Sequence, residues 1–121
     1  MAHYAYVVHS NPVPGREDEY NDWYSNRHLA DVVAVPGFVS AQRFCLTDVA
    51  SENRPLQKYM AIYTMDTDAP EKTLEHLTSL VETGAMFMSE AFSMEGMATH
   101  LYEAITPVVN APAKGIRHDQ G

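Results

Sequence analysis

The sequence has little of what several common classes of protein require. Cys45 is the only cysteine among its 121 residues, which excludes a disulfide framework and a metal site built of several cysteines. There are 8 lysines and arginines against 16 aspartates and glutamates, which gives a formal net charge of −8. Nucleic acids and anionic membranes both attract basic surfaces, so this acidity argues against either as a partner.

Other signals are missing as well. No apolar run approaches the ~20 residues that a membrane span needs. The first residues, Met-Ala-His-Tyr-Ala-Tyr, lack the basic segment and apolar core of a signal peptide, so we expect a cytoplasmic protein. The sequence also lacks an H-E-x-x-H metal motif, a glycine loop for phosphate and a nucleophile elbow. We therefore expect no metal site and no bound cofactor.

What remains is a globular composition with three enriched residue types. The chain is 45% hydrophobic and 20% charged, which suits one folded domain. Its seven tyrosines, seven methionines and six histidines are the less ordinary part. We expect residues 1–106 to form the domain and residues 107–121, which have little apolar pattern, to form a C-terminal tail.

The order of the predicted elements is that of a ferredoxin-like α+β fold. Hydrophobic periodicity and turn residues predict strands over residues 3–9, 38–46, 56–65 and 97–105, and helices over 16–33 and 69–83. The β-α-β-β-α-β order predicts a four-stranded antiparallel sheet with two helices on one face. In the second strand we expect Phe38, Ser40, Gln42, Phe44 and Leu46 to share a face.

Both faces of the predicted sheet are apolar. In the third strand, for example, Tyr63 alternates with Ile62. A single layer of helices covers only one face of a sheet. We therefore expect a second copy of the chain on the other face, in a homodimer packed sheet to sheet.

The first predicted helix carries most of the candidate chemistry. Tyr20, Tyr24, His28 and Val32 recur at every fourth position and therefore lie on one face, with Trp23 beside them. A core helix normally carries leucine and valine at such positions. Enclosed phenols and an imidazole need partners, which points to a pocket between this helix and the sheet.

Three residues of this helix are predicted to be catalytic. His28 can move a proton, because the ordinary pKa of imidazole lies near neutrality. Asp31, three residues later, can fix its tautomer and stabilise the imidazolium form. Tyr24 can donate a hydrogen bond to a developing oxyanion. Tyr20 and Trp23 are predicted to bind substrate. The alternative is that His28 and Asp31 pair at the helix end while the tyrosines fill the core.

A methionine-rich segment comes after the second predicted helix. Met86, Met88, Met94 and Met97 would form an adaptable wall for an apolar or aromatic ligand, and we take Met86 as a further candidate for substrate binding. The alternative is that these methionines fill the core and the dimer interface.

Several of these runs together resemble the EthD-type branch of the dimeric α/β barrels. The resemblance rests on Glu-Tyr-Asn-Asp-Trp-Tyr at 19–24, His28-Leu29, Asp31-Val32, Val-Pro-Gly-Phe at 35–38 and Ala-Gln-Arg-Phe at 41–44. It is densest over residues 19–44 and extends, as strand order, to about residue 106. It implies a ferredoxin-like protomer whose sheet closes a barrel with its twin.

The resemblance also implies residue roles. His28 takes the place of the helix-one histidine of the branch, and Tyr24 that of the aromatic residue one turn earlier. Ala30 stands where the branch often has a proline, which bears on how the helix ends. Tyr63, on the third strand, is a candidate for substrate binding by its position.

The functions of the branch cover isomerases of lactone catabolism, polyketide cyclases, decarboxylases, hydroxynitrile lyases and cofactor-free monooxygenases. The resemblance therefore implies a cofactor-independent lyase, isomerase or cyclase that does acid/base chemistry on a small, apolar, aromatic carbonyl compound. Two alternatives are a haem-binding or cofactor-free monooxygenase, with a histidine as candidate axial ligand, and a non-catalytic binding protein for hydrophobic metabolites. An RNA-recognition domain shares the strand order, but the acidity of the chain disfavours it.

Overall fold

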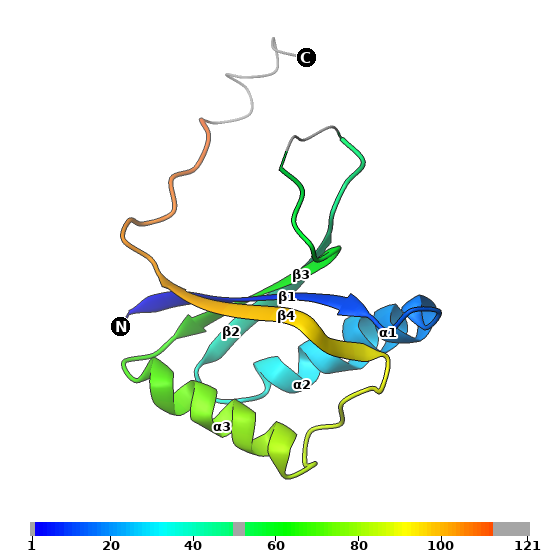
Figure 1. The fold of residues 1–121 in the computed structure, drawn as a ribbon. Coiled ribbons are helices and arrows are strands. Elements are labelled where there is room, and N and C mark those ends of the chain that lie inside the picture. Colours follow the sequence, from blue (N-terminus) through cyan, green and yellow to red (C-terminus); the bar gives the residue numbers. More distant parts are fainter. Residues whose placement is uncertain (1, 50–52, 113–121) are drawn as a thin grey trace.

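The computed structural model describes residues 2–49 and 53–112. The strands are β1 (His3–Pro12), β2 (Phe38–Cys45), β3 (Tyr59–Asp66) and β4 (Phe92–Glu103). The helical segments are α1 (Glu17–Trp23), η1 (Tyr24–His28), α2 (Leu29–Val33) and α3 (Pro70–Glu82). The sheet has the order β2-β3-β1-β4 and is antiparallel throughout, with the helices on one of its faces (Figure 1). This is the predicted ferredoxin-like α+β fold.

The sheet face that meets the helices is set by β3. Tyr59, Ala61, Tyr63 and Met65 are all buried there, as the alternation of the sequence predicts. Polar side chains also lie on this face. Ser10 of β1 is buried beside these residues, and its hydroxyl is hydrogen-bonded to a tyrosine of α1.

The predicted common face of β2 is wrong at its first residue. Phe38 and Ser40 pair with consecutive residues of β3, so Val39 is an extra residue and forms a β-bulge. Phe38 is therefore buried on the helix side, whereas Ser40 and Gln42 are exposed. One inserted residue reverses the side-chain direction of all later residues in a strand.

Two strands are longer than predicted, for a shared reason. The sequence predicts a chain break over residues 11–15 and shows no clear pattern over residues 85–96. In the structure Asn11 and Pro12 pair with Ser93 and Phe92, across a register shift that comes after His9. This pairing between β1 and β4 depends on tertiary contact, and the local sequence of either segment does not predict it.

Gly37 lies in the turn between α2 and β2, and this turn packs closely against α3. Its φ of +105° lies in the region that favours glycine, and a Cβ atom there would lie 2.7 Å from Oγ1 of Thr73 on α3. The carbonyl of Gly37 also accepts a hydrogen bond from the backbone N–H of Asp66, at 2.9 Å. The turn is thus held against both α3 and β3, the two elements that face each other across the site.

No helix in the described part of the chain covers the second face of the sheet (Figure 1). By strand alternation this open face carries Val7, Ile62, Phe44 and, on neighbouring strands, His9 and His100. The two imidazole rings lie 6.2 Å apart. Within residues 2–49 and 53–112, no helix is long and apolar enough to cross a membrane.

The segment 104–112 is exposed and forms neither helix nor strand. The remainder of the predicted tail, residues 113–121, lies outside the described residues.

Candidate functional site

The helical stretch after β1 contains one wide turn. In η1 the backbone N–H of Leu29 donates to the carbonyl of Tyr24, five residues back instead of the usual four. This π-turn brings residues five apart to the same side of the helix. The rings of Trp23 and His28 consequently stack, with centroids 4.6 Å apart and planes inclined by 28°.

The predicted face of this helix is buried along its whole length. Tyr20, Tyr24, His28 and Val32 are all buried against the core. Tyr24 stands edge-on to Tyr20 at 5.5 Å and to His28 at 5.1 Å. The hydroxyl of Tyr20 makes a 2.6 Å hydrogen bond with Ser10, so this tyrosine is satisfied within the core.

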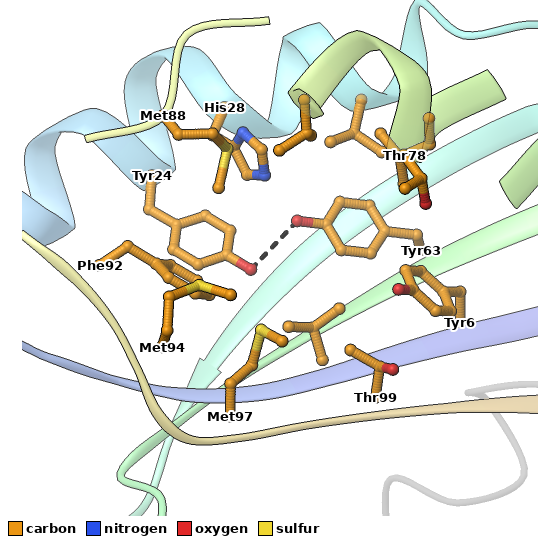
Figure 2. A pocket seen from close by; sticks show the side chains of 14 residues that line it. Tyr6, Tyr24, His28, Tyr63, Thr78, Met88, Phe92, Met94, Met97 and Thr99 are labelled. Atoms are coloured by element: carbon orange, nitrogen blue, oxygen red, sulfur yellow. Dashed lines mark hydrogen bonds between the residues drawn. The ribbon is translucent and has the colours of Figure 1, made fainter. Parts of the chain in front are cut away.

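A cavity of about 210 Å³ lies between the helices and the sheet (Figure 2). It is lined by Tyr6, Val8, Tyr24, His28, Val32, Tyr63, Leu77, Thr78, Val81, Met88, Phe92, Met94, Met97 and Thr99. The exposed members of this set, Thr78, Met94 and Thr99, mark the side that faces solvent. An apolar cavity of ~150 Å³ holds one benzene ring. This cavity is therefore sized for roughly one to two aromatic rings.

Two tyrosines form a pair of neutral hydroxyls at the inner end of the cavity (Figure 2). Tyr63 donates a hydrogen bond to the hydroxyl oxygen of Tyr24, at 3.2 Å. Burial raises the pKa of Tyr24 to about 12 and also raises the pKa of Tyr63, so both keep their protons at neutral pH. Since Tyr24 accepts from Tyr63, its own proton is available for an oxygen atom of a ligand.

His28 is a neutral base in the same cavity. Burial lowers the pKa of His28 to about 4, and the smaller effect of the nearby Asp31 carboxylate opposes this shift. Its Nδ1 atom is buried and has no hydrogen-bond partner within residues 2–49 and 53–112. A buried polar atom without a partner is costly. Because the protein itself encloses Nδ1, the ring nitrogen that a ligand in the cavity can reach is Nε2.

Asp31 does not make the contact predicted for it. Its carboxylate lies 3.5 Å from Nε of Arg27, four residues earlier, where both groups are partly exposed. No hydrogen bond joins Asp31 to His28. The ion pair keeps the carboxylate hydrated, whereas a bond to His28 would require its burial. The tautomer of His28 is thus not fixed by Asp31.

The predicted binding residues divide into two groups. Tyr63 lines the cavity, as do the predicted catalytic residues His28 and Tyr24. Tyr20, Trp23 and Met86 are buried but do not line it. Trp23 instead backs the imidazole ring, and Met86 packs in the core. The methionine wall of the cavity comes from Met88, Met94 and Met97.

Three polar lining residues, Tyr6, Thr78 and Thr99, are not among the predicted site residues. They come from β1, α3 and β4, so only the assembled fold brings them together. Strand alternation places Tyr6 on the same face as Val8, which is the one signal that the sequence offers. The described residues contain no group of three side chains suited to hold a metal ion.

No family model and no curated protein matches this chain. Solved structures share its fold. The haem-degrader MhuD of Mycobacterium tuberculosis, with two haems in its active site, gives a TM-score of 0.59 at 12% identity, over 88% of this chain and 99% of that one. SnoaB of Streptomyces nogalater, a cofactor-independent oxygenase, gives 0.56 at 18% identity, over 91% of this chain and 100% of that one.

An EthD family protein from Bacillus halodurans is also similar. Its TM-score is 0.52 at 14% identity, over 87% of this chain and 100% of that one. Two further structures of this fold are described as dimeric ferredoxin-like proteins. At such identities the likeness establishes the fold. It is the fold that the EthD-type resemblance implies.

Proposed function

We propose that this protein is a cofactor-independent oxygenase of a small, enolisable aromatic compound. The observation that carries the proposal is the neutral His28 imidazole, which has no hydrogen-bond partner among the described residues. It lies beside the Tyr24–Tyr63 hydroxyl pair in a mostly apolar cavity. This arrangement suits the removal of a proton from an apolar substrate and the stabilisation of the resulting oxyanion. The similar fold of SnoaB, a cofactor-independent oxygenase, supports the choice of reaction.

The chemistry begins with a proton transfer. His28 accepts a proton from the carbon next to the substrate carbonyl, and Tyr24 donates a hydrogen bond to the enolate oxygen. The enolate is itself the reductant: a CH₂ group and O₂ give a carbonyl group and water, so no protein-bound electron carrier is needed. The negative charge that develops on the enolate during the transfer raises the pKa of the adjacent imidazole, which stabilises the proton on His28 as it arrives.

A lyase, isomerase or cyclase would share the proton transfer and differ in the later steps. In those reactions the carbanion or enolate rearranges or expels a group, and oxygen is not consumed. The amount of oxygen consumed per substrate molecule therefore distinguishes the two functions, whereas the site residues do not.

Haem does not fit this cavity. A porphyrin carries four pyrrole rings, whereas the space accommodates roughly one to two aromatic rings. We therefore assign no step to haem, although MhuD shares the fold and binds it.

Oxygen uptake tests the proposed function. We expect the protein to accelerate oxygen consumption with 2-tetralone, a bicyclic enolisable ketone of suitable size, and to leave tetralin, which lacks the carbonyl group, unchanged. An oxygen electrode gives the rate, and chromatography gives the ratio of oxygen used to ketone lost. Loss of ketone without oxygen uptake would favour a lyase or isomerase. A stoichiometric Soret band on addition of haem would favour the haem-binding alternative.

We also propose that the open face of the sheet binds a second copy of the chain. Its apolar centre and the dimeric ferredoxin-like proteins of the same fold support this. Ile62→Glu, which places a charge beside Val7 at the centre of the face, should convert the dimer to a monomer in sedimentation velocity at micromolar concentration. Ser79→Glu, on the exposed side of α3, is the matched control. A monomeric wild-type protein would contradict the proposal.

A further inference from the structure

Arg43 lies behind the cavity and does not line it. Its guanidinium carbon lies over the ring of Tyr24, 4.5 Å from the centroid. It also lies 5.2 Å from the ring centroid of Tyr20 and 5.1 Å from that of Tyr59. One cation is thus enclosed by three phenol rings, an arrangement that stabilises both the charge and the orientation of the rings.

The same guanidinium is hydrogen-bonded to both sides of the start of the π-turn. Nη2 donates to Oδ1 of Asn21 on α1, at 2.9 Å, and Nη1 donates to Oγ of Ser25 on η1, at 2.7 Å. The rigid fork of an arginine can hold two acceptors at a fixed separation, which a lysine cannot do. Arg43 therefore clamps the α-helical turn to the π-turn that comes after it.

The π-turn needs such a clamp because it is an uncommon arrangement for ordinary residues. The segment Tyr24–His28 contains neither glycine nor proline, so nothing in its own sequence enforces the wide turn. A regular α-helix would place residues 23 and 28 in different directions. The Trp23–His28 stack, and with it the direction of the imidazole into the cavity, depends on the wide turn.

We propose that Arg43 is a positioning residue of the cavity, which holds the π-turn and thereby sets His28 and Tyr24. The proposal rests on the proposed function only in taking this cavity as the functional site. Arg43 touches no space that a substrate can occupy, and it acts through the helix and through the Tyr24 ring. Its positive charge also opposes the effect of burial on the pKa of the Tyr24 phenol, which makes that hydroxyl a stronger donor.

Trp23 provides a direct readout, because it is the only tryptophan in the chain. Protonation of an imidazole stacked on an indole quenches the indole fluorescence, so the emission of Trp23 should titrate with His28. In the wild-type protein we expect a midpoint near pH 4. Beside the imidazole, Tyr24 stays neutral over the acid range, and Asp31 with its ion-pair partner Arg27 is unchanged in every variant.

Arg43→Met should raise this midpoint by at least one pH unit, toward the ordinary value of ~6.5, because release of the π-turn exposes His28 to water. Arg43→Lys should raise it to a similar extent, since an ammonium group keeps the charge but cannot bridge Asn21 and Ser25. Arg54→Met is the control, because the guanidinium of Arg54 donates a hydrogen bond to the carbonyl of Thr47 and does not line the cavity. It should leave the midpoint unchanged. Far-UV circular dichroism at each pH shows that the variant is folded.

A folded Arg43→Met protein with the wild-type midpoint would overturn the proposal. A wild-type midpoint in the Arg43→Lys protein would also overturn it, because the charge of residue 43, and not its two hydrogen bonds, would then set the pKa of His28. If Arg43→Met does not fold, Ser25→Ala decides the matter, because it removes one acceptor and keeps the arginine. We expect a smaller rise in its midpoint, and no rise would contradict the clamp. None of these readouts requires turnover, so they are independent of the oxygen-uptake assay.

Discussion

His28→Phe should lower the rate of oxygen uptake by about 10²–10⁴-fold, the usual contribution of a positioned general base. Phenylalanine keeps an aromatic ring against Trp23 and Tyr24, whose centroids lie 4.6 and 5.1 Å from that of the imidazole. It removes both ring nitrogen atoms and enlarges the ring by one atom. The fold should therefore survive, and the loss of rate should report the proton transfer and not the packing.

The measurement is the initial rate of oxygen uptake with 2-tetralone, together with the melting temperature of each protein. His76→Phe is the matched control, because His76 is exposed on α3 and does not line the cavity. It should keep the wild-type rate. Retention of the wild-type rate by a folded His28→Phe protein would contradict the role of His28 as the base.

Acid should destabilise the wild-type protein by about 3 kcal/mol between pH 7 and pH 4 through His28 alone. The pKa of His28 is about 4 in the folded protein and ~6.5 in the unfolded chain, so the unfolded chain binds more protons across this window. The free energy of unfolding therefore falls as the pH drops through 6.5, and the loss is nearly complete at pH 4. Above pH 7 the group is neutral in both states and contributes no pH dependence.

The comparison that isolates this effect is the difference between wild-type and His28→Phe stability at each pH. Urea unfolding at fixed protein concentration gives both free energies, and carboxylates elsewhere act equally on the two proteins. Glu17, whose pKa is held low by Lys58 and Tyr59, is one of these. The wild-type curve should fall more steeply between pH 6.5 and 4. Parallel curves would show that His28 is not buried as a neutral base.

The part of the site that depends on local periodicity could be predicted from the sequence. Tyr20, Tyr24, His28 and Val32 are one helical turn apart, and that spacing alone places them on one buried face. The fold can be derived in the same way from strand and helix order. Prediction failed where two interactions compete. Asp31 can reach either His28 or Arg27, and it is the retained hydration of the ion pair that decides for Arg27.

The π-turn could not be predicted because its cause lies elsewhere in the chain. Residues 24–28 have no sequence feature that widens a helix, and the fork that holds them comes from β2. The same applies to Val39, whose bulge depends on pairing with β3. Nothing in a methionine-rich run shows which member faces the cavity, and Met86 packs in the core while Met88 lines the space.

Three thioethers, those of Met88, Met94 and Met97, stand along a space in which molecular oxygen is proposed to react. Reduced oxygen species that escape there convert methionine to its sulfoxide, which is polar and chiral. Each oxidised methionine would replace part of the apolar lining of the cavity with a polar group and weaken the binding of an aromatic substrate. These methionines would therefore limit how many catalytic cycles one molecule completes before methionine sulfoxide reductases repair it. They would affect the working lifetime of the protein more than its initial rate.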